Sequence, residues 1–134
     1  MGLSENARKV NKKMKHDQDI TGPNTITAGE YKQIVAPVYT DDTDTTPETD
    51  LGDGLVEWHL KGVKGIDLIS KSTDDESITV YGSTSNYIVI EIFEEDTIGL
   101  TSGDYYHLAE FTINGVKIGL FDGICTIDNR VGGD

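Results

Sequence analysis

Apolar and polar residues alternate in several short stretches of the chain, which is the pattern of half-buried β-strands. The clearest case is Tyr87–Phe93, where Ile88, Ile90 and Ile92 share one face. The same alternation predicts further strands over Ile26–Tyr39, Gly54–Lys61, Ile66–Lys71, Ser77–Tyr81, Tyr105–Ile113 and Val116–Phe121. About seven short strands separated by turn residues predict an all-β fold, an antiparallel β-sandwich.

The connections between these strands carry their own signals. Asn114-Gly115 supplies the two positive-φ positions of a type I′ turn, so the last two predicted strands should form a hairpin. Glu94–Asp104 is too long for a tight turn, and we expect a short helical turn that crosses between sheets and buries Ile98 and Leu100. Pro37 confines its part of the strand to a sheet edge or a bulge, because proline has no N–H to donate.

The candidate core follows from the apolar faces of the strands. Trp58 lies on such a face and is the residue against which we expect the two sheets to pack. Tyr105 follows a Ser-Gly-Asp turn, at the place where an immunoglobulin-like sandwich has its corner tyrosine, whose hydroxyl bonds to an upstream backbone group. The predicted core residues are Val56, Trp58, Leu60, Ile88, Ile90, Ile92, Leu100 and Tyr105.

Charge divides the chain into a basic arm and an acidic body. The net charge is −13, and residues 1–16 contain five basic residues and one acidic residue. These sum to +4, so the rest of the chain carries −17, the difference between −13 and +4. We expect an arm over 1–22, a sandwich over 23–128 and a polar tail over 129–134. The arm residues predicted to contact a partner are Leu3, Arg8, Lys9, Val10, Lys12, Lys13, Met14 and Lys15.

The arm has two possible states. Leu3, Ala7, Val10 and Met14 are spaced as one stripe of a short helix, which would be marginal alone in water and stable when a partner covers the stripe. The alternative is a disordered basic tail.

Several binding classes do not fit the composition. The strongly acidic body disfavours nucleic acid as a partner. No apolar run reaches the length of a membrane span. We therefore predict binding to neither nucleic acid nor a membrane. The N-terminus lacks the apolar stretch of a secretory signal. Cys125 is the single cysteine and is expected to be a buried apolar residue, which suggests folding in a reducing compartment.

No cofactor or metal site is predicted. The acidic stretch Thr40–Asp53 begins like an EF-hand loop but has Thr46 and Pro47 where that loop needs an acidic ligand and glycine. His59 lies on the polar face of its strand, with no second histidine at ligand spacing, and we expect an exposed side chain.

A run of motifs resembles a known family. These motifs are Ala28-Gly29-Glu30, the Asp53-Gly54-x-Val56-x-Trp58 strand, Asp96-Thr97-Ile98-Gly99-Leu100, Gly103-Asp104-Tyr105-Tyr106-His107 and Phe121-Asp122-Gly123. Together they look like the small immunoglobulin-like domains of tailed-bacteriophage virion proteins, such as the N-terminal domain of baseplate upper proteins and related head, neck and tail components. The basic arm and the long acidic loop depart from that pattern.

The resemblance implies a non-enzymatic structural protein that assembles in multiple copies, through its arm and sandwich surfaces, with itself and other virion proteins. It implies a place in the virion, with assembly in the host cytoplasm. The alternative is a small ligand- or carbohydrate-binding sandwich. Its sugar platform would draw on the aromatic residues Tyr31, Tyr39, Trp58, Tyr81, Tyr87, Tyr105 and Tyr106. No catalytic constellation is visible in the sequence, so enzyme activity is not expected.

Overall fold

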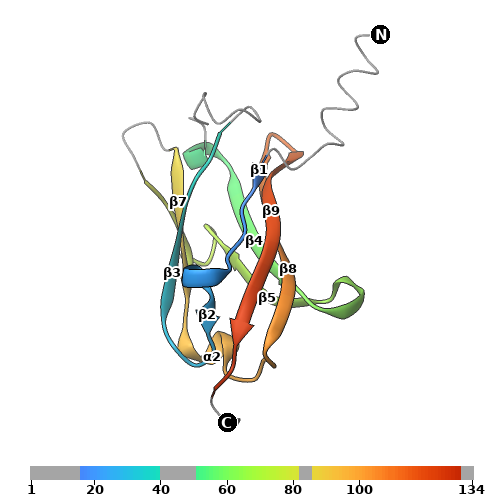
Figure 1. Ribbon diagram of the computed structural model, residues 1–134. Helices are drawn as coiled ribbons and strands as arrows, with labels where there is room; N and C mark the ends of the chain where they lie inside the picture. The colour runs from blue at the N-terminus through green and yellow to red at the C-terminus, as the bar shows by residue number, and fades with distance from the viewer. Residues whose placement is uncertain (1–15, 40–50, 82–85, 131–134) are drawn as a thin grey trace.

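The computed structural model describes residues 16–39, 51–81 and 86–130, which form a β-sandwich of two packed sheets (Figure 1). The large sheet has the order β1-β9-β8-β4-β5, and β2 also pairs with β9. Its strands are β1 (His16–Asp17), β2 (Ile26–Thr27), β4 (Leu55–Lys61), β5 (Asp67–Ser72), β8 (Gly103–Ile113) and β9 (Val116–Asp128). The small sheet has the order β3-β7-β6, with strands β3 (Lys32–Pro37), β6 (Ile78–Tyr81) and β7 (Tyr87–Ile92).

The predicted immunoglobulin-like sandwich is confirmed. Strands β9-β8-β4-β5 facing β3-β7-β6 reproduce the G-F-C-C′ and B-E-D sheets of an immunoglobulin fold. These neighbours are antiparallel, whereas the short β1 and β2 run parallel to β9. The described helices are η1 (Gly22–Asn24), η2 (Leu51–Asp53), η3 (Val63–Gly65) and α2 (Glu94–Thr97). None of them is long and apolar enough to cross a membrane.

The first predicted strand, Ile26–Tyr39, is divided into two. Ile26 and Thr27 pair with β9 of the large sheet, whereas Lys32–Pro37 pair with β7 of the small sheet. The crossing is made by a turn in which Gly29 has a φ of 84°, a conformation that glycine adopts at little cost. Pro37 lies on β3, an edge strand, as predicted.

The core lies between the inward faces of the sheets. The six predicted strand residues Val56, Trp58, Leu60, Ile88, Ile90 and Ile92 are fully buried. Leu100 and Tyr105 are partly buried and pack against this core. The prediction of a buried Cys125 is also confirmed.

The described sandwich begins before the expected boundary at residue 23. His16 pairs with Phe121, and the backbone N–H groups of Gln18 and Ile20 donate to carbonyls of β9 at 2.8 Å. The side chain of Ile20 is buried in the core. Residues 16–20 therefore belong to the folded body, because they supply both ladder hydrogen bonds and apolar contact. The predicted contact residues from Leu3 to Lys15 lie outside the described residues, as does the acidic stretch 40–50.

The two predicted connections have different outcomes. Asn114 and Gly115 have φ values of 54° and 78°, which confirms the type I′ turn. The expected helical turn is α2, but the prediction that Ile98 is buried is wrong, since its exposed fraction is 52%. Thr97 is buried instead, and its Oγ1 accepts a hydrogen bond of 2.9 Å from the N–H of Gly29. The threonine is suited to this place because its buried hydroxyl has a partner.

Candidate functional site

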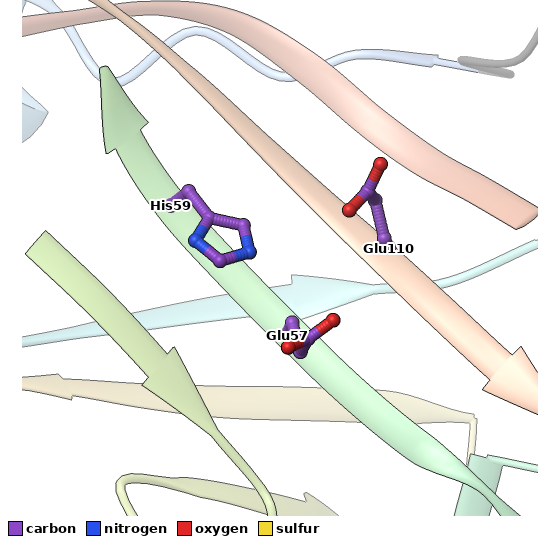
Figure 2. Close-up of side chains that lie close together, drawn as sticks. All are labelled: Glu57, His59 and Glu110. Atoms are coloured by element: carbon purple, nitrogen blue, oxygen red, sulfur yellow. The ribbon is translucent and has the colours of Figure 1, made fainter. Parts of the chain in front are cut away.

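Polar side chains from three neighbouring strands meet on the outer face of the large sheet. Because Val56, Trp58 and Leu60 point into the core, the alternation of β4 sends Glu57 and His59 outward. Glu57 is the register partner of Glu110 on β8. Figure 2 shows His59, Glu57 and Glu110 gathered over these two strands. We call these three residues, together with Lys117 of β9, the outer-face cluster.

The outer-face cluster is compact. One donor atom from each of Glu57, His59 and Glu110 lies within 4.8 Å of the others, and all three residues are half-buried. Two carboxylates opposite each other on adjacent strands repel. Lys117 offsets this repulsion, because its Nζ lies 3.7 Å from Oε1 of Glu110 and 4.0 Å from Oε1 of Glu57.

The ring of His59 is held from the other side by β5. Its Nδ1 lies 3.1 Å from the hydroxyl of Ser70 and 3.5 Å from a carboxylate oxygen of Asp67. Asp67 in turn pairs with Lys61, and this hydrogen bond lowers the pKa of the aspartate. With Nδ1 occupied, Nε2 is the ring nitrogen on the side of the two glutamates (Figure 2).

The prediction of an exposed His59 is wrong. Its side chain is only 15% exposed, and its neighbour Glu110 comes from β8, far away in the sequence. Only the register of β4 against β8 reveals the grouping, and that register is a long-range pairing with no local sequence signal.

A second polar group lies inside the sandwich. The indole Nε1 of Trp58 donates to Nδ1 of His107 at 3.0 Å, so Nε2 of this ring carries the proton and donates to the carbonyl of Gln18. His107 is fully buried, and burial lowers the pKa of its imidazole. His107 also lines a pocket of about 150 Å³ beside β3, together with Lys32 and Phe121. Both ring nitrogens of His107 therefore have hydrogen-bond partners within the protein.

The corner tyrosine is confirmed. The hydroxyl of Tyr105 donates to the backbone carbonyl of Thr101 at 2.6 Å. The side chain of Asn129 reinforces this corner by donating to the carbonyl of Leu100. Cys125, opposite Tyr105 on β9, is buried, and burial raises the pKa of its thiol to about 12. The thiol therefore stays protonated and is a poor nucleophile.

The aromatic residues of the alternative sugar-binding function do not share one surface. Trp58 is buried in the core. Tyr81 and Tyr87 stack at 5.7 Å on the small sheet. Tyr106 lies on the large sheet, where it donates to Asp122 at 2.6 Å, and burial raises the pKa of its hydroxyl to about 12. These seven predicted aromatic residues therefore build no common platform.

Exposed apolar residues lie on the connection between β4 and β5, which projects from the side of the sandwich, and at the start of β5 (Figure 1). The exposed fractions are 81% for Val63, 61% for Ile66 and 40% for Leu68. Lys64 and Gly65 both have positive φ and turn the chain there. We call these three apolar residues the β4–β5 tip.

The comparisons with known proteins add no relative to this picture. No protein-family model matches this sequence, and no curated protein matches it significantly.

Proposed function

We propose that this protein is a non-enzymatic structural component of a tailed-phage particle, and that it assembles in multiple copies through its N-terminal arm and its sandwich surfaces. The observation that carries the proposal is the segregation of charge. Residues 1–16 carry a net charge of +4, and the remaining chain carries −17. The resemblance of the sequence motifs to virion domains supports the same role.

The place where the arm joins the body favours contact with a neighbour. Strand β1 is the outer member of the large sheet, so residues 1–15 join the sandwich at a sheet edge. A segment with this composition is costly to order alone, and is ordered by a partner that covers its apolar residues and offers acidic groups. The acidic body of a second copy offers such groups.

The β4–β5 tip is a second surface for assembly. A single exposed aliphatic residue is ordinary on a protein surface, but here three exposed aliphatic residues lie within six positions of the chain, on the turn and at the start of β5. Burying them against a neighbouring protein would remove apolar area from water and favour association.

The experiment removes the arm and leaves the body complete. Deletion must end at Lys15, because His16–Ile20 contribute to the large sheet and the core. We expect the truncated protein to keep its thermal midpoint and to lose co-sedimentation with particles that lack the protein. Charge reversal at Lys9, Lys12, Lys13 and Lys15 should weaken attachment, and most at low salt, where the attraction is least screened.

A matched variant separates the two surfaces. Val63→Ser with Ile66→Ser changes only exposed side chains of the β4–β5 tip. If the arm-deleted protein binds fully and this double variant does not, the contact with the particle lies on the sandwich and not on the arm. Full binding by both variants would contradict the proposed contacts.

A further inference from the structure

We propose that Glu57, His59 and Glu110 bind one divalent transition-metal ion of the zinc class, and that Lys117 competes with the ion for the two carboxylates. This site lies on the outer face of the large sheet and is independent of the assembly function proposed above. The observation behind it is the convergence of one imidazole and two carboxylates within 4.8 Å.

The chemistry of the donors selects the class of metal. Calcium and magnesium take oxygen ligands almost alone. Imidazole nitrogen together with carboxylate oxygen suits zinc and its neighbours in the first transition row. Three protein ligands also leave one position of a tetrahedral ion open, as in zinc sites that accept water or a further ligand.

The spacing allows the site to close by side-chain rotation. Zinc bonds of about 2.0–2.2 Å place the ligands of a tetrahedral ion about 3.4 Å apart. The donor atoms here lie within 4.8 Å of one another, so they must approach by up to about 1.4 Å. Glu57 and Glu110 can make that approach by rotation, while the ladder between β4 and β8 keeps their backbones opposite each other.

The histidine is oriented as metal-binding histidines are. A ligating imidazole usually has its other nitrogen hydrogen-bonded to a polar group, which fixes the tautomer and the ring. Nδ1 of His59 has Ser70 at 3.1 Å and Asp67 at 3.5 Å. Nε2 is thereby left for the ion, on the side of the two glutamates (Figure 2).

Lys117 lowers the affinity of the site for a metal ion. Its ammonium group lies against both carboxylates, where a cation would bind. The lysine side chain is 56% exposed, so it can move into water at little cost when an ion arrives. A divalent ion attracts the two carboxylates more strongly than one ammonium does. Removing the ammonium should therefore raise the affinity for the metal.

The test titrates the full chain with zinc in a non-chelating buffer near neutral pH and measures heat of binding and thermal midpoint. We expect one zinc ion per chain and a higher midpoint, because a ligand that binds the folded state stabilises it. His59→Gln should weaken binding at least tenfold, about the loss seen when even an outer-shell partner is removed. Lys117→Gln should tighten binding severalfold. Calcium in excess should not compete.

His16→Gln is the matched control, since β1 is separated from β4 by two strands of the large sheet. We expect it to bind zinc like the parent protein. Each variant is first compared without metal, so that a change of fold is recognised by its midpoint. The proposal is overturned if the parent protein binds no zinc, or if His59→Gln binds it equally well. The competition by Lys117 is overturned if Lys117→Gln fails to tighten binding, because the ammonium group would then not oppose the metal.

Discussion

The indole N–H of Trp58 donates a hydrogen bond to Nδ1 of His107 in the centre of the sandwich. His107 stands two residues after the corner Tyr105, where antibody domains place the second cysteine of their inter-sheet disulfide beside a tryptophan. Here a polar bridge takes that place. A second hydrogen bond runs from His107 to the carbonyl of Gln18, so the bridge also holds the chain around Gln18 against the core.

This bridge predicts loss of stability in mild acid. The folded-state pKa of His107 is lowered from 6.5 by burial, although the Gln18 carbonyl and the carboxylates of Asp122 and Asp19 oppose the shift. Below pH 6.5 the unfolded chain therefore binds a proton that the folded chain does not. The free energy of unfolding should fall from near pH 6.5 downward, by up to about 1.4 kcal/mol per pH unit, until the folded pKa is passed. Urea denaturation between pH 7.5 and 5 measures this slope.

Two variants identify the responsible histidine. His107→Gln should be less stable than the parent protein at pH 7.5 and should lose the slope between pH 6.5 and 5.5. His59→Gln should keep it, since His59 lies outside the core. An unchanged slope in His107→Gln would assign the pH dependence to other groups.

The corner hydrogen bond predicts a measurable cost for Tyr105→Phe. The hydroxyl donates to the carbonyl of Thr101 at 2.6 Å, and Tyr105 packs against the core. Losing one satisfied hydrogen bond should reduce the free energy of unfolding by about 1 kcal/mol. Chemical denaturation checks it, with Tyr106→Phe as the control on the outer face. An unaltered midpoint, or a larger effect in the control, would contradict the assignment.

The sequence was sufficient for those features that local pattern determines. Alternation identified the inward faces of β4 and β7, and Asn114-Gly115 identified the hairpin turn. These features depend on period and on backbone conformation, which neighbouring residues set. The corner of Tyr105 was predictable for the same reason, because its partner Thr101 is only four residues away.

Features that depend on distant pairing were missed. Residues 16–20 carry little strand pattern, and their place beside β9 depends on the burial of Ile20 and on space left by Gly123. The outer-face cluster required the register of β4, β8 and β9, which the hydrophobic pattern leaves undetermined. The choice of Thr97 over Ile98 as the buried residue was decided by a hydrogen bond to Gly29, which hydrophobicity alone does not predict.

Gly123 gives a prediction about the N-terminal segment. A Cβ at this position would lie 2.8 Å from the carbonyl oxygen of Gln18 and 3.0 Å from its carbonyl carbon. These are backbone atoms, so Gly123→Ala should push residues 18–20 away from β9. Hydrogen exchange should show faster exchange at the amides of Gln18 and Ile20, which donate to β9. Amides in β4 should keep their protection.

Gly99→Ala is the matched control, since an added Cβ there meets nothing within 4 Å. It should leave the exchange of residues 18–20 unchanged. Equal protection in Gly123→Ala and the parent protein would mean that the segment tolerates the methyl group without leaving the sheet.

The ion pair between Lys71 and Asp96 supports the last prediction. Lys71 of β5 is 7% exposed, and its Nζ lies 2.5 Å from Oδ2 of Asp96 in α2 and 4.9 Å from the centre of the Phe93 ring. The same carboxylate oxygen accepts the N–H of Phe93 at 2.7 Å. The pair thus ties the connection after β7 of the small sheet to an edge strand of the large sheet.

Asp96→Asn should cost about 3 kcal/mol of unfolding free energy, because it leaves a buried ammonium without its counter-ion. Lys71→Met should cost less, since the remaining carboxylate keeps the Phe93 N–H and is 21% exposed. The double variant should be more stable than Asp96→Asn alone, because methionine removes the unpaired charge while filling a similar volume. Denaturation of all four proteins forms a double-mutant cycle that gives the coupling energy directly. Additive single and double effects would show that Lys71 and Asp96 are energetically independent, and the tie between the two sheets would then rest on apolar packing around Phe93.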